Sequence, residues 1–239
     1  MSWYLQSVRT DGLAFADIVR ASPLRTPIAT CPGWDLRALT EHLGAVHRWA
    51  RLAAITGRQP EDSAIEAAPQ EQGALADWLA EGADALADSL ASIPDGAPTW
   101  HPFPVPLVAR VWPRRQAHET AIHHWDAGSA VGQAPTIDPM RATDFVGEYL
   151  SVVVPRVIDR DGRRAPQGEL HLVLVDSGVE FGVRVEGTVV DVVDPHALRD
   201  PATITGTAED VLLALWRRRP LVDAPTSGRA ADWLAFGGN

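Results

Sequence analysis

Apolar side chains recur at helical spacing between residue 2 and residue 157 of the chain. Residues three and four positions apart form an apolar stripe, which is typical of a helix that buries one face. We expect such helices over residues 2–21, from residue 36, over 75–93, over 115–128 and from residue 138 to 157. Loops rich in proline, glycine and polar residues separate them. Together these elements predict an antiparallel helical bundle.

The pattern changes after Ile158, where a charged segment containing glycine and proline, residues 159–166, suggests a hinge. Short runs of β-branched residues separated by turns then predict strands at 171–175, 181–184 and 189–193. A capping box from Thr207 to Asp210 opens a helix, and residues 229–236 form a last short helix. The predicted fold class is therefore α+β, with a helical bundle at 1–160 and a small α+β domain at 166–239.

Composition and charge limit the classes of function. The chain has 239 residues, a net charge of -10 and 46% hydrophobic residues, enough for real cores. All 21 basic residues are arginine, which suggests a high-GC, bacterial genome. The negative charge argues against nucleic acid or an anionic membrane as the main partner. The single cysteine fits a reducing compartment, no apolar run reaches membrane-spanning length, and the first residues lack a basic region followed by an apolar one. We therefore expect a soluble, cytoplasmic protein.

The densest chemistry lies in residues 115–126, which hold three histidines and two carboxylates. At about 100° per residue, Glu119 and His123 share one stripe of a helix, and Asp126 follows on that stripe. Arg115 lies one turn before Glu119 on the same side. Glu119 and His123 offer half of a metal site, although ordinary pairs on a helix surface would give the same spacing.

The remaining histidines do not fit one ion with this pair. His118 and His123 are five residues apart, about 140° around the helix, so this is not the metalloprotease motif. We interpret His118 and His124 as packing or supporting residues. On the helix that begins near residue 36, His42 lies at the edge of the apolar stripe, whereas His47 points about 140° away and is expected at the surface.

Two stretches, residues 30–44 (TCPGWDLRALTEHLG) and 115–126 (RQAHETAIHHWD), resemble the mycothiol-dependent maleylpyruvate isomerase family. The resemblance implies a DinB-like four-helix bundle that holds a divalent metal, usually zinc, through His42, Glu119 and His123. Residues 206–216 (GTAEDVLLALW) are similar to that family's sterol-carrier-like C-terminal domain. The likeness therefore runs through nearly the whole chain.

Two histidines and one carboxylate leave a fourth position open, as in catalytic zinc sites. Such an ion lowers the pKa of a bound water or thiol. The resemblance implies that the thiol is mycothiol, a cofactor of actinobacteria, and that the substrate is a small electrophile undergoing isomerisation or thiol transfer. Asp126 could orient His123, as carboxylates often do for metal-bound imidazole.

Two other classes of function stay open at this stage. The chain could be a binding or regulatory protein on the same scaffold, with or without metal, or a metal hydrolase that uses water. Arg217, Arg218 and Arg219 could bind a substrate carboxylate, or they could simply be the charged end of a helix. Cys31 is better interpreted as a small loop residue than as a reactive thiol. The pattern specifies neither the electrophile nor the oligomeric state.

Overall fold

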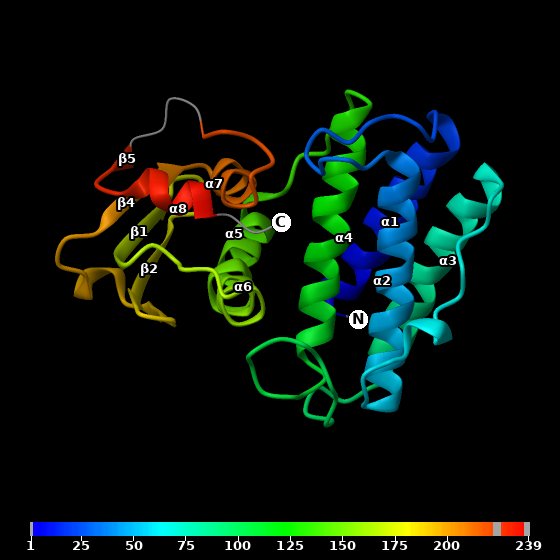
Figure 1. Ribbon diagram of the computed structural model, residues 1–239, viewed down its shortest axis with the longest axis horizontal. Coiled ribbons are helices and arrows are strands. Elements are labelled where there is room, and N and C mark those ends of the chain that lie inside the picture. Colours follow the sequence, from blue (N-terminus) through cyan, green and yellow to red (C-terminus); the bar gives the residue numbers. More distant parts are fainter. Residues whose placement is uncertain (1, 222–225, 237–239) are drawn as a thin grey trace. The chain divides into compact units, whose positions relative to one another are not determined.

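The structure is a computed structural model that describes residues 2–221 and 226–236. Its chain divides into two compact units (Figure 1). The first comprises the residues up to 101 and 106–135, and the second comprises 102–105 and the residues from 136 onward. The division after residue 135 differs from the boundary expected near residue 160.

The first unit is a four-helix bundle, as predicted. Its helices are α1 (Trp3–Ala21), α2 (Leu36–Thr56), α3 (Gln72–Ala91) and α4 (Val111–Ala130), with a 3₁₀ turn, η1, at Asp62–Ala64. Helices α1 and α2 each pack against both α3 and α4. The start of α2 is capped by the carboxylate of Asp35, which accepts a hydrogen bond from the backbone N–H of Ala38.

The order of helix directions differs from the antiparallel order expected. Helices α2 and α3 run in the same direction, as two contacts show. Near the start of both helices Arg37 binds the carbonyl oxygen of Gln70, and toward their ends Arg51 binds the hydroxyl of Ser89. Residues 57–71 must therefore carry the chain back along the bundle before α3 begins. Helix α2 runs antiparallel to α4, so residues further along α2 contact residues earlier in α4.

Close packing between α2 and α3 depends on a glycine. A Cβ atom placed on Gly44 would lie 2.0 Å from the ring of Trp78, so only glycine lets this ring lie against the α2 backbone. The core beside it is apolar, and its fully buried members include Phe15, Leu39 and Leu79. Because α2 packs against α3 on one side and α4 on the other, more than one stripe of α2 is buried.

The second unit begins with a helix that we had expected in the bundle. The chain forms α5 (Pro139–Glu148), a π-helical turn η2 (Tyr149–Val153) and α6 (Val154–Asp161). The rings of Phe145 and Tyr149 pack edge-on against Trp216, with centroids 6.2 and 5.5 Å away. The apolar stripe was correctly interpreted as a buried helical face, but a stripe does not specify which partner covers it. This explains the misplaced boundary.

A five-stranded mixed sheet forms the rest of the second unit. The strands are β1 (Gly168–Leu174), β2 (Val179–Glu186), β3 (Val189–Val193), β4 (Ala202–Gly206) and β5 (Thr226–Ser227), in the order β3-β2-β1-β4-β5. Neighbours are antiparallel except β1 and β4, which are parallel. The remaining elements are the 3₁₀ turn η3 (Pro195–Ala197) and helices α7 (Ala208–Leu215) and α8 (Ala230–Phe236).

These elements confirm the α+β fold class. The predicted strands overlap most of β1, lie within β2 and coincide with β3, whereas β4 and β5 were not predicted. Thr207 caps α7 as expected, since its hydroxyl accepts a hydrogen bond from the backbone N–H of Asp210 and donates one to the Asp210 carboxylate. Among the described residues, no helix is both long and apolar enough to cross a membrane.

Candidate metal centre

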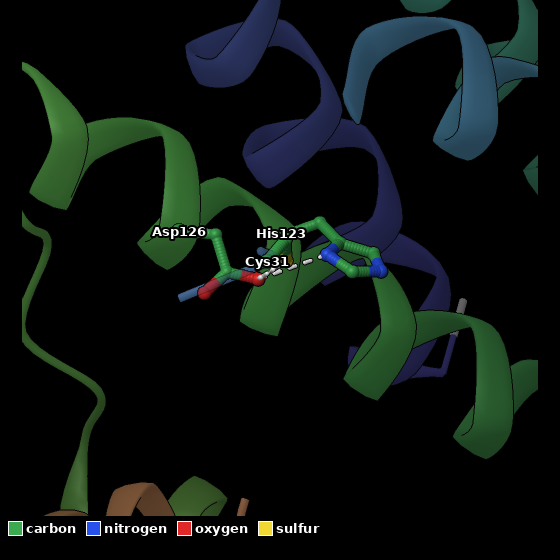
Figure 2. Close-up of side chains that lie close together, drawn as sticks. All are labelled: Cys31, His123 and Asp126. Atoms are coloured by element: carbon green, nitrogen blue, oxygen red, sulfur yellow. Dashed lines mark hydrogen bonds and ion pairs between the residues drawn. The ribbon is translucent and has the colours of Figure 1, made fainter. Parts of the chain in front are cut away.

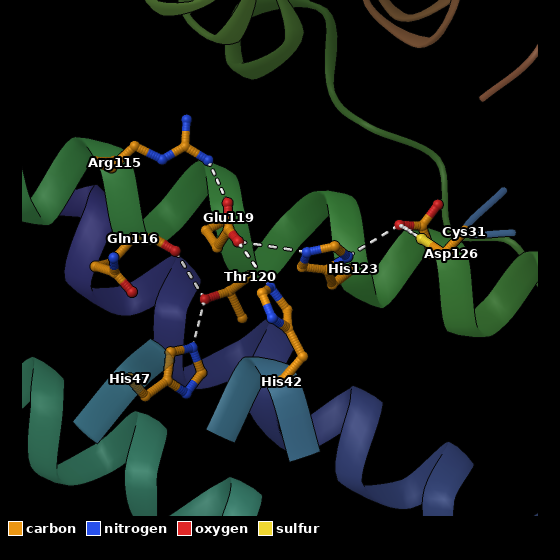
Figure 3. A network of polar contacts seen from close by, with 9 residues as sticks. All are labelled: Cys31, His42, His47, Arg115, Gln116, Glu119, Thr120, His123 and Asp126. Atoms are coloured by element: carbon orange, nitrogen blue, oxygen red, sulfur yellow. Dashed lines mark hydrogen bonds and ion pairs between the residues drawn. The ribbon is translucent and has the colours of Figure 1, made fainter. Parts of the chain in front are cut away.

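Helix α4 carries the densest polar cluster into the interior of the bundle. Its residues between 115 and 128 are mostly buried, polar side chains included. Glu119 and His123 lie one turn apart on α4 and face His42 of α2 (Figure 3). The antiparallel packing of α2 on α4 brings these three side chains together, although His42 lies 77 residues before Glu119.

The two imidazole rings approach the same oxygen of the Glu119 carboxylate. Oε1 of Glu119 lies 3.4 Å from Nε2 of His42 and 3.4 Å from Nε2 of His123. Ligand atoms about 2.1 Å from a tetrahedral zinc ion are roughly 3.4 Å apart by simple geometry. The three ligand-type atoms all lie within 4.8 Å of one another. Two imidazoles and a carboxylate are also a donor set that divalent zinc accepts, so these residues fit such an ion.

Exposure differs across the cluster. The side chain of His42 is 36% exposed, whereas those of Glu119 and His123 are 19% and 8% exposed. Solvent therefore reaches the cluster from the side of His42. The indole of Trp34 packs on this ring, with centroids 4.9 Å apart, and covers part of it.

The two oxygens of Glu119 have different partners. Nη2 of Arg115 donates a hydrogen bond of 2.7 Å to Oε2, which leaves Oε1 facing the two histidines. Burial disfavours the charged carboxylate, but the hydrogen bonds with His123 and His42 and the charge of Arg115 outweigh it. They hold the pKa of Glu119 well below its usual value. Glu119 is thus an anion in the absence of metal.

His123 lies between two carboxylates. Its Nδ1 is 3.0 Å from Oδ2 of Asp126, the position in which Asp126 was expected to orient the ring (Figure 2). Burial disfavours the charged imidazolium, yet hydrogen bonding to Asp126 and Glu119 outweighs burial and raises the pKa of His123 to about 9. A metal ion that binds Nε2 near neutral pH must therefore displace a proton.

Asp126 is held by two residues of the loop before α2. The hydroxyl of Thr30 donates a hydrogen bond of 2.7 Å to Oδ1, and Sγ of Cys31 lies 3.6 Å from Oδ2. Cys31, His123 and Asp126 also form a second group of potential metal ligands. No pattern in the sequence connects Thr30 or Cys31 with this centre, because they precede Asp126 by 96 and 95 residues and share no periodicity with it.

The expectation that His47 lies at the surface was wrong. Its side chain is fully buried, and Nε2 lies 2.9 Å from the hydroxyl of Thr120 on α4. That hydroxyl donates to the carbonyl oxygen of Gln116, so Nε2 of His47 carries the proton. Burial lowers the pKa of His47 to about 3. The error arose because α2 packs on two neighbours, so a side chain 140° from one buried stripe meets the other helix.

The other histidines of α4 lie against α1. His118 is fully buried and its ring contacts Tyr4, while Nδ1 of His124 is 3.1 Å from Oδ1 of Asp11. These contacts agree with the packing role expected for both residues. Neither histidine belongs to a group of three potential metal ligands within the described parts of the chain.

Two of the arginines after α7, Arg218 and Arg219, have side-chain partners in the second unit. Arg219 forms an ion pair with Asp210, and Nη1 of Arg218 donates to the carbonyl oxygen of Trp216.

Comparisons with known proteins agree with this architecture. Residues 5–128 match the family of the mycothiol maleylpyruvate isomerase N-terminal domain. A crystal structure of the mycothiol-dependent maleylpyruvate isomerase has 14% identity and a TM-score of 0.55, over 94% of this chain and 91% of that one. A histidine-to-alanine mutant of that isomerase gives 12% identity with the same TM-score and coverage. No curated protein sequence matches the chain.

At these identities the solved structures show a shared fold, whereas the matched N-terminal domain covers more than half of the chain. The matched domain contains α2 and α4, and therefore all three residues that converge at the candidate centre. The chain belongs to the mycothiol-dependent maleylpyruvate isomerase family.

Proposed function

We propose that this protein is a metal-dependent enzyme that uses a low-molecular-weight thiol, mycothiol, to isomerise a small electrophile or to transfer the thiol to it. The observation that carries the proposal is the convergence of His42, Glu119 and His123 on one point of the bundle interior. Family membership supports the reaction class, since the solved relatives are named as mycothiol-dependent maleylpyruvate isomerases.

The proposed ion, zinc in our interpretation, would be held by Nε2 of His42, Oε1 of Glu119 and Nε2 of His123. When bound, it would act as a Lewis acid that favours the ionised form of a thiol over the neutral form. Three protein ligands leave room for a further ligand in tetrahedral coordination, as in catalytic zinc sites.

The charges around the cluster favour an anionic ligand. Glu119 contributes one negative charge to the ligand set, and Arg115, bound to Oε2, offsets it. The imidazoles are neutral when they bind metal. Asp126 adds a second negative charge beside His123, so a dipositive ion at this point keeps part of its excess positive charge, and an anionic sulfur or carboxylate is stabilised there.

The residues around the ligands would give the cluster its shape. Asp126 holds the ring of His123 from the side of Nδ1, and Arg115 holds the carboxylate of Glu119 through Oε2. Trp34 covers part of His42 and replaces water with an apolar surface on one side of the cluster. Ligand and substrate would therefore approach at the exposed part of His42.

Two measurements on the purified protein test the proposal. Elemental analysis should find about one divalent metal per chain, because the cluster offers one set of three ligands. Assays with maleylpyruvate and a panel of thiol-accepting electrophiles should show turnover that requires both metal and mycothiol. Turnover without added thiol would replace the proposal with a hydrolase that uses water. Bound metal without turnover of any electrophile would favour a binding or regulatory protein.

Calorimetry can separate thiol binding from turnover. Mycothiol should release a proton when it binds the metal-loaded protein, because its sulfur is expected to bind as thiolate. Titrations in buffers of different ionisation enthalpy would measure the proton, and the metal-free protein should release none. If saturating mycothiol produced neither heat nor a change in the spectrum of a cobalt-substituted sample, the thiol-dependent reaction would be rejected while the metal site would stand.

A further inference from the structure

The carboxylate of Asp126 is a buried link between α4 and the loop that precedes α2. The residue is 1% exposed, and its two oxygens have different partners. Oδ1 accepts the hydroxyl hydrogen of Thr30 at 2.7 Å. Oδ2 lies 3.0 Å from Nδ1 of His123, as Figure 2 shows. Thr30, Asp126 and His123 thus form a continuous chain of hydrogen bonds toward the candidate metal centre.

The side chain of Asp126 does not by itself keep this orientation. The last torsion of an aspartate is broad, so its carboxylate plane can turn with little cost unless a partner fixes one oxygen. A hydrogen bond to a charged acceptor is stronger than one between neutral groups, and in a buried place it has little competition from water. The short hydrogen bond from the Thr30 hydroxyl to Oδ1 therefore fixes the plane of the carboxylate, beside the longer contact of Cys31 Sγ with Oδ2.

The orientation of Oδ2 matters for the ring of His123. A carboxylate at Nδ1 keeps a proton on that nitrogen and leaves Nε2 as the nitrogen that can bind an ion. Nε2 is also the atom that faces Oε1 of Glu119 at 3.4 Å. If Asp126 turned away, the ring would lose both its preferred tautomer and the contact that fixes its rotation.

The loop presents Thr30 from a well-defined backbone. The backbone N–H of Ile28 donates to the carbonyl of Trp34, and that of Cys31 donates back to Ile28. The side chain of Ile28 is 2% exposed and belongs to the bundle core. Thr30 is therefore held at a set distance from α4, which a positioning group requires.

We infer that the hydroxyl of Thr30 is a positioning group for His123, acting through Asp126. It fixes the carboxylate so that Nδ1 of His123 stays protonated and Nε2 points toward Glu119 and His42. In treating His123 as a metal ligand, the inference rests on the proposed function. Thr30 itself does not touch the metal, the thiol or the substrate.

The test compares three threonine variants of the full chain. Thr30→Val keeps the shape of the side chain but removes the hydroxyl, whereas Thr30→Ser keeps the hydroxyl. Thr26→Val is a matched control in the same loop, because the Thr26 hydroxyl binds the carbonyl of Pro23 and not Asp126. Thermal unfolding of each metal-free variant checks that it is folded.

Zinc affinity, measured by competition with a chromophoric chelator, is the first readout. Thr30→Val should weaken zinc binding by about tenfold or more, the usual effect of losing a partner of a metal-binding histidine. Thr30→Ser and Thr26→Val should bind zinc as the unchanged protein does. Equal zinc affinity for Thr30→Val and the unchanged protein would overturn the inference, and so would a Thr30→Ser variant as weak as Thr30→Val.

The second readout does not need metal. In protein with ¹⁵N-labelled histidine, the Nδ1 proton of His123 should give an NMR signal protected from exchange, assigned by its loss in His123→Gln. Thr30→Val should broaden or remove this signal, while Thr30→Ser should retain it. A protected signal that persists in Thr30→Val would overturn the inference. If the unchanged protein bound no zinc, the proposed function would fail, and this signal would still decide the role of Thr30.

Discussion

The two units differ in how they group buried charged and titratable side chains. In the bundle, Arg115, His123 and Asp126 are buried together with the fully buried His47. In the second unit, described pairs such as His171 with Glu180 and Arg184 with Glu169 retain exposure to solvent on the sheet. Burying charges costs free energy unless each finds a partner.

This difference indicates where chemistry is expected. A bundle made only for stability could fill the interface of α2 and α4 with apolar side chains of similar volume. Instead that interface holds a chain of partnered charges that ends on three potential metal ligands. The second unit also buries Thr143 and the carboxylate of Glu148, but within the described residues the groups of three potential metal ligands lie in the first unit.

The largest expected effect is the loss of metal from the bundle. His42→Ala and His123→Ala should each remove most of the bound metal, because two remaining ligands hold an ion poorly. His171→Ala is the matched control, since this histidine pairs with Glu180 on the sheet of the second unit. Elemental analysis after gel filtration would measure the content. Full metal retention in both bundle variants would remove the distinction between the units and reject the site.

The second effect is a strong dependence of metal affinity on pH. The ring of His123, with its pKa raised to about 9, is protonated below that pH and must lose a proton before it binds an ion. Affinity should therefore rise by about tenfold per pH unit toward pH 9. Chelator competition at pH 6 to 8.5 would measure this slope. Asp126→Asn should shift the rise to lower pH, because it removes the negative charge beside Nδ1.

If the metal affinity of the unchanged protein did not change with pH above pH 7, the role given to Asp126 would be contradicted.

The raised pKa of His123 also affects the stability of the metal-free protein. The stabilisation from His123 is fully present below pH 6.5, its ordinary value, and is lost as pH rises through about 9. Metal-free protein should accordingly lose stability on the alkaline side.

The third effect concerns His47, which we expect to support the bundle without binding metal. Its pKa is lowered to about 3 by burial, so the unfolded chain takes up a proton below pH 6.5 that the folded chain does not. Because of this group, the free energy of unfolding should fall by about 1.4 kcal/mol for each pH unit as the pH is lowered from 6.5 to about 3. Urea unfolding of His47→Gln should show that slope reduced.

Metal content provides the control for His47. His47→Gln and His118→Ala should keep near-normal metal at neutral pH, because neither ring points to the cluster of Glu119 and His123. Loss of the ion from His118→Ala to the extent seen in His123→Ala would mean that the helical phase assigned to α4 is incorrect.

The smallest effect is expected in the second unit. Glu169 accepts hydrogen bonds from the backbone N–H of Arg199, the side chain of Arg184 and the backbone N–H of Asp200, which lower its pKa to about 2. Its contribution to stability is present above pH 4.5 and is lost only as pH falls through about 2. Carboxyl NMR titration should show this low midpoint, and Arg184→Gln should raise it. A midpoint near 4.5 in the unchanged protein would contradict the contacts.

Several features followed from the sequence by itself. Helical periodicity placed Glu119, His123 and Asp126 on one stripe, because the spacing of side chains around a helix depends only on its local geometry. Capping residues such as Asp35 and Thr207 predicted helix starts, since their hydrogen bonds reach only a few residues. His42 entered through the family resemblance of residues 30–44, because periodicity could place it only at the edge of an apolar stripe.

The tertiary structure decided what depends on partners distant along the chain. A stripe says that a face is buried but not by what, so the helix from residue 139 packs with Trp216 instead of joining the bundle. His47 is buried because α2 has two neighbours, which no pattern within α2 reveals. Thr30 meets Asp126 only because the loop before α2 folds against the end of α4. Contacts between residues so far apart depend on the path of the whole chain, whereas local spacing is the same in any helix.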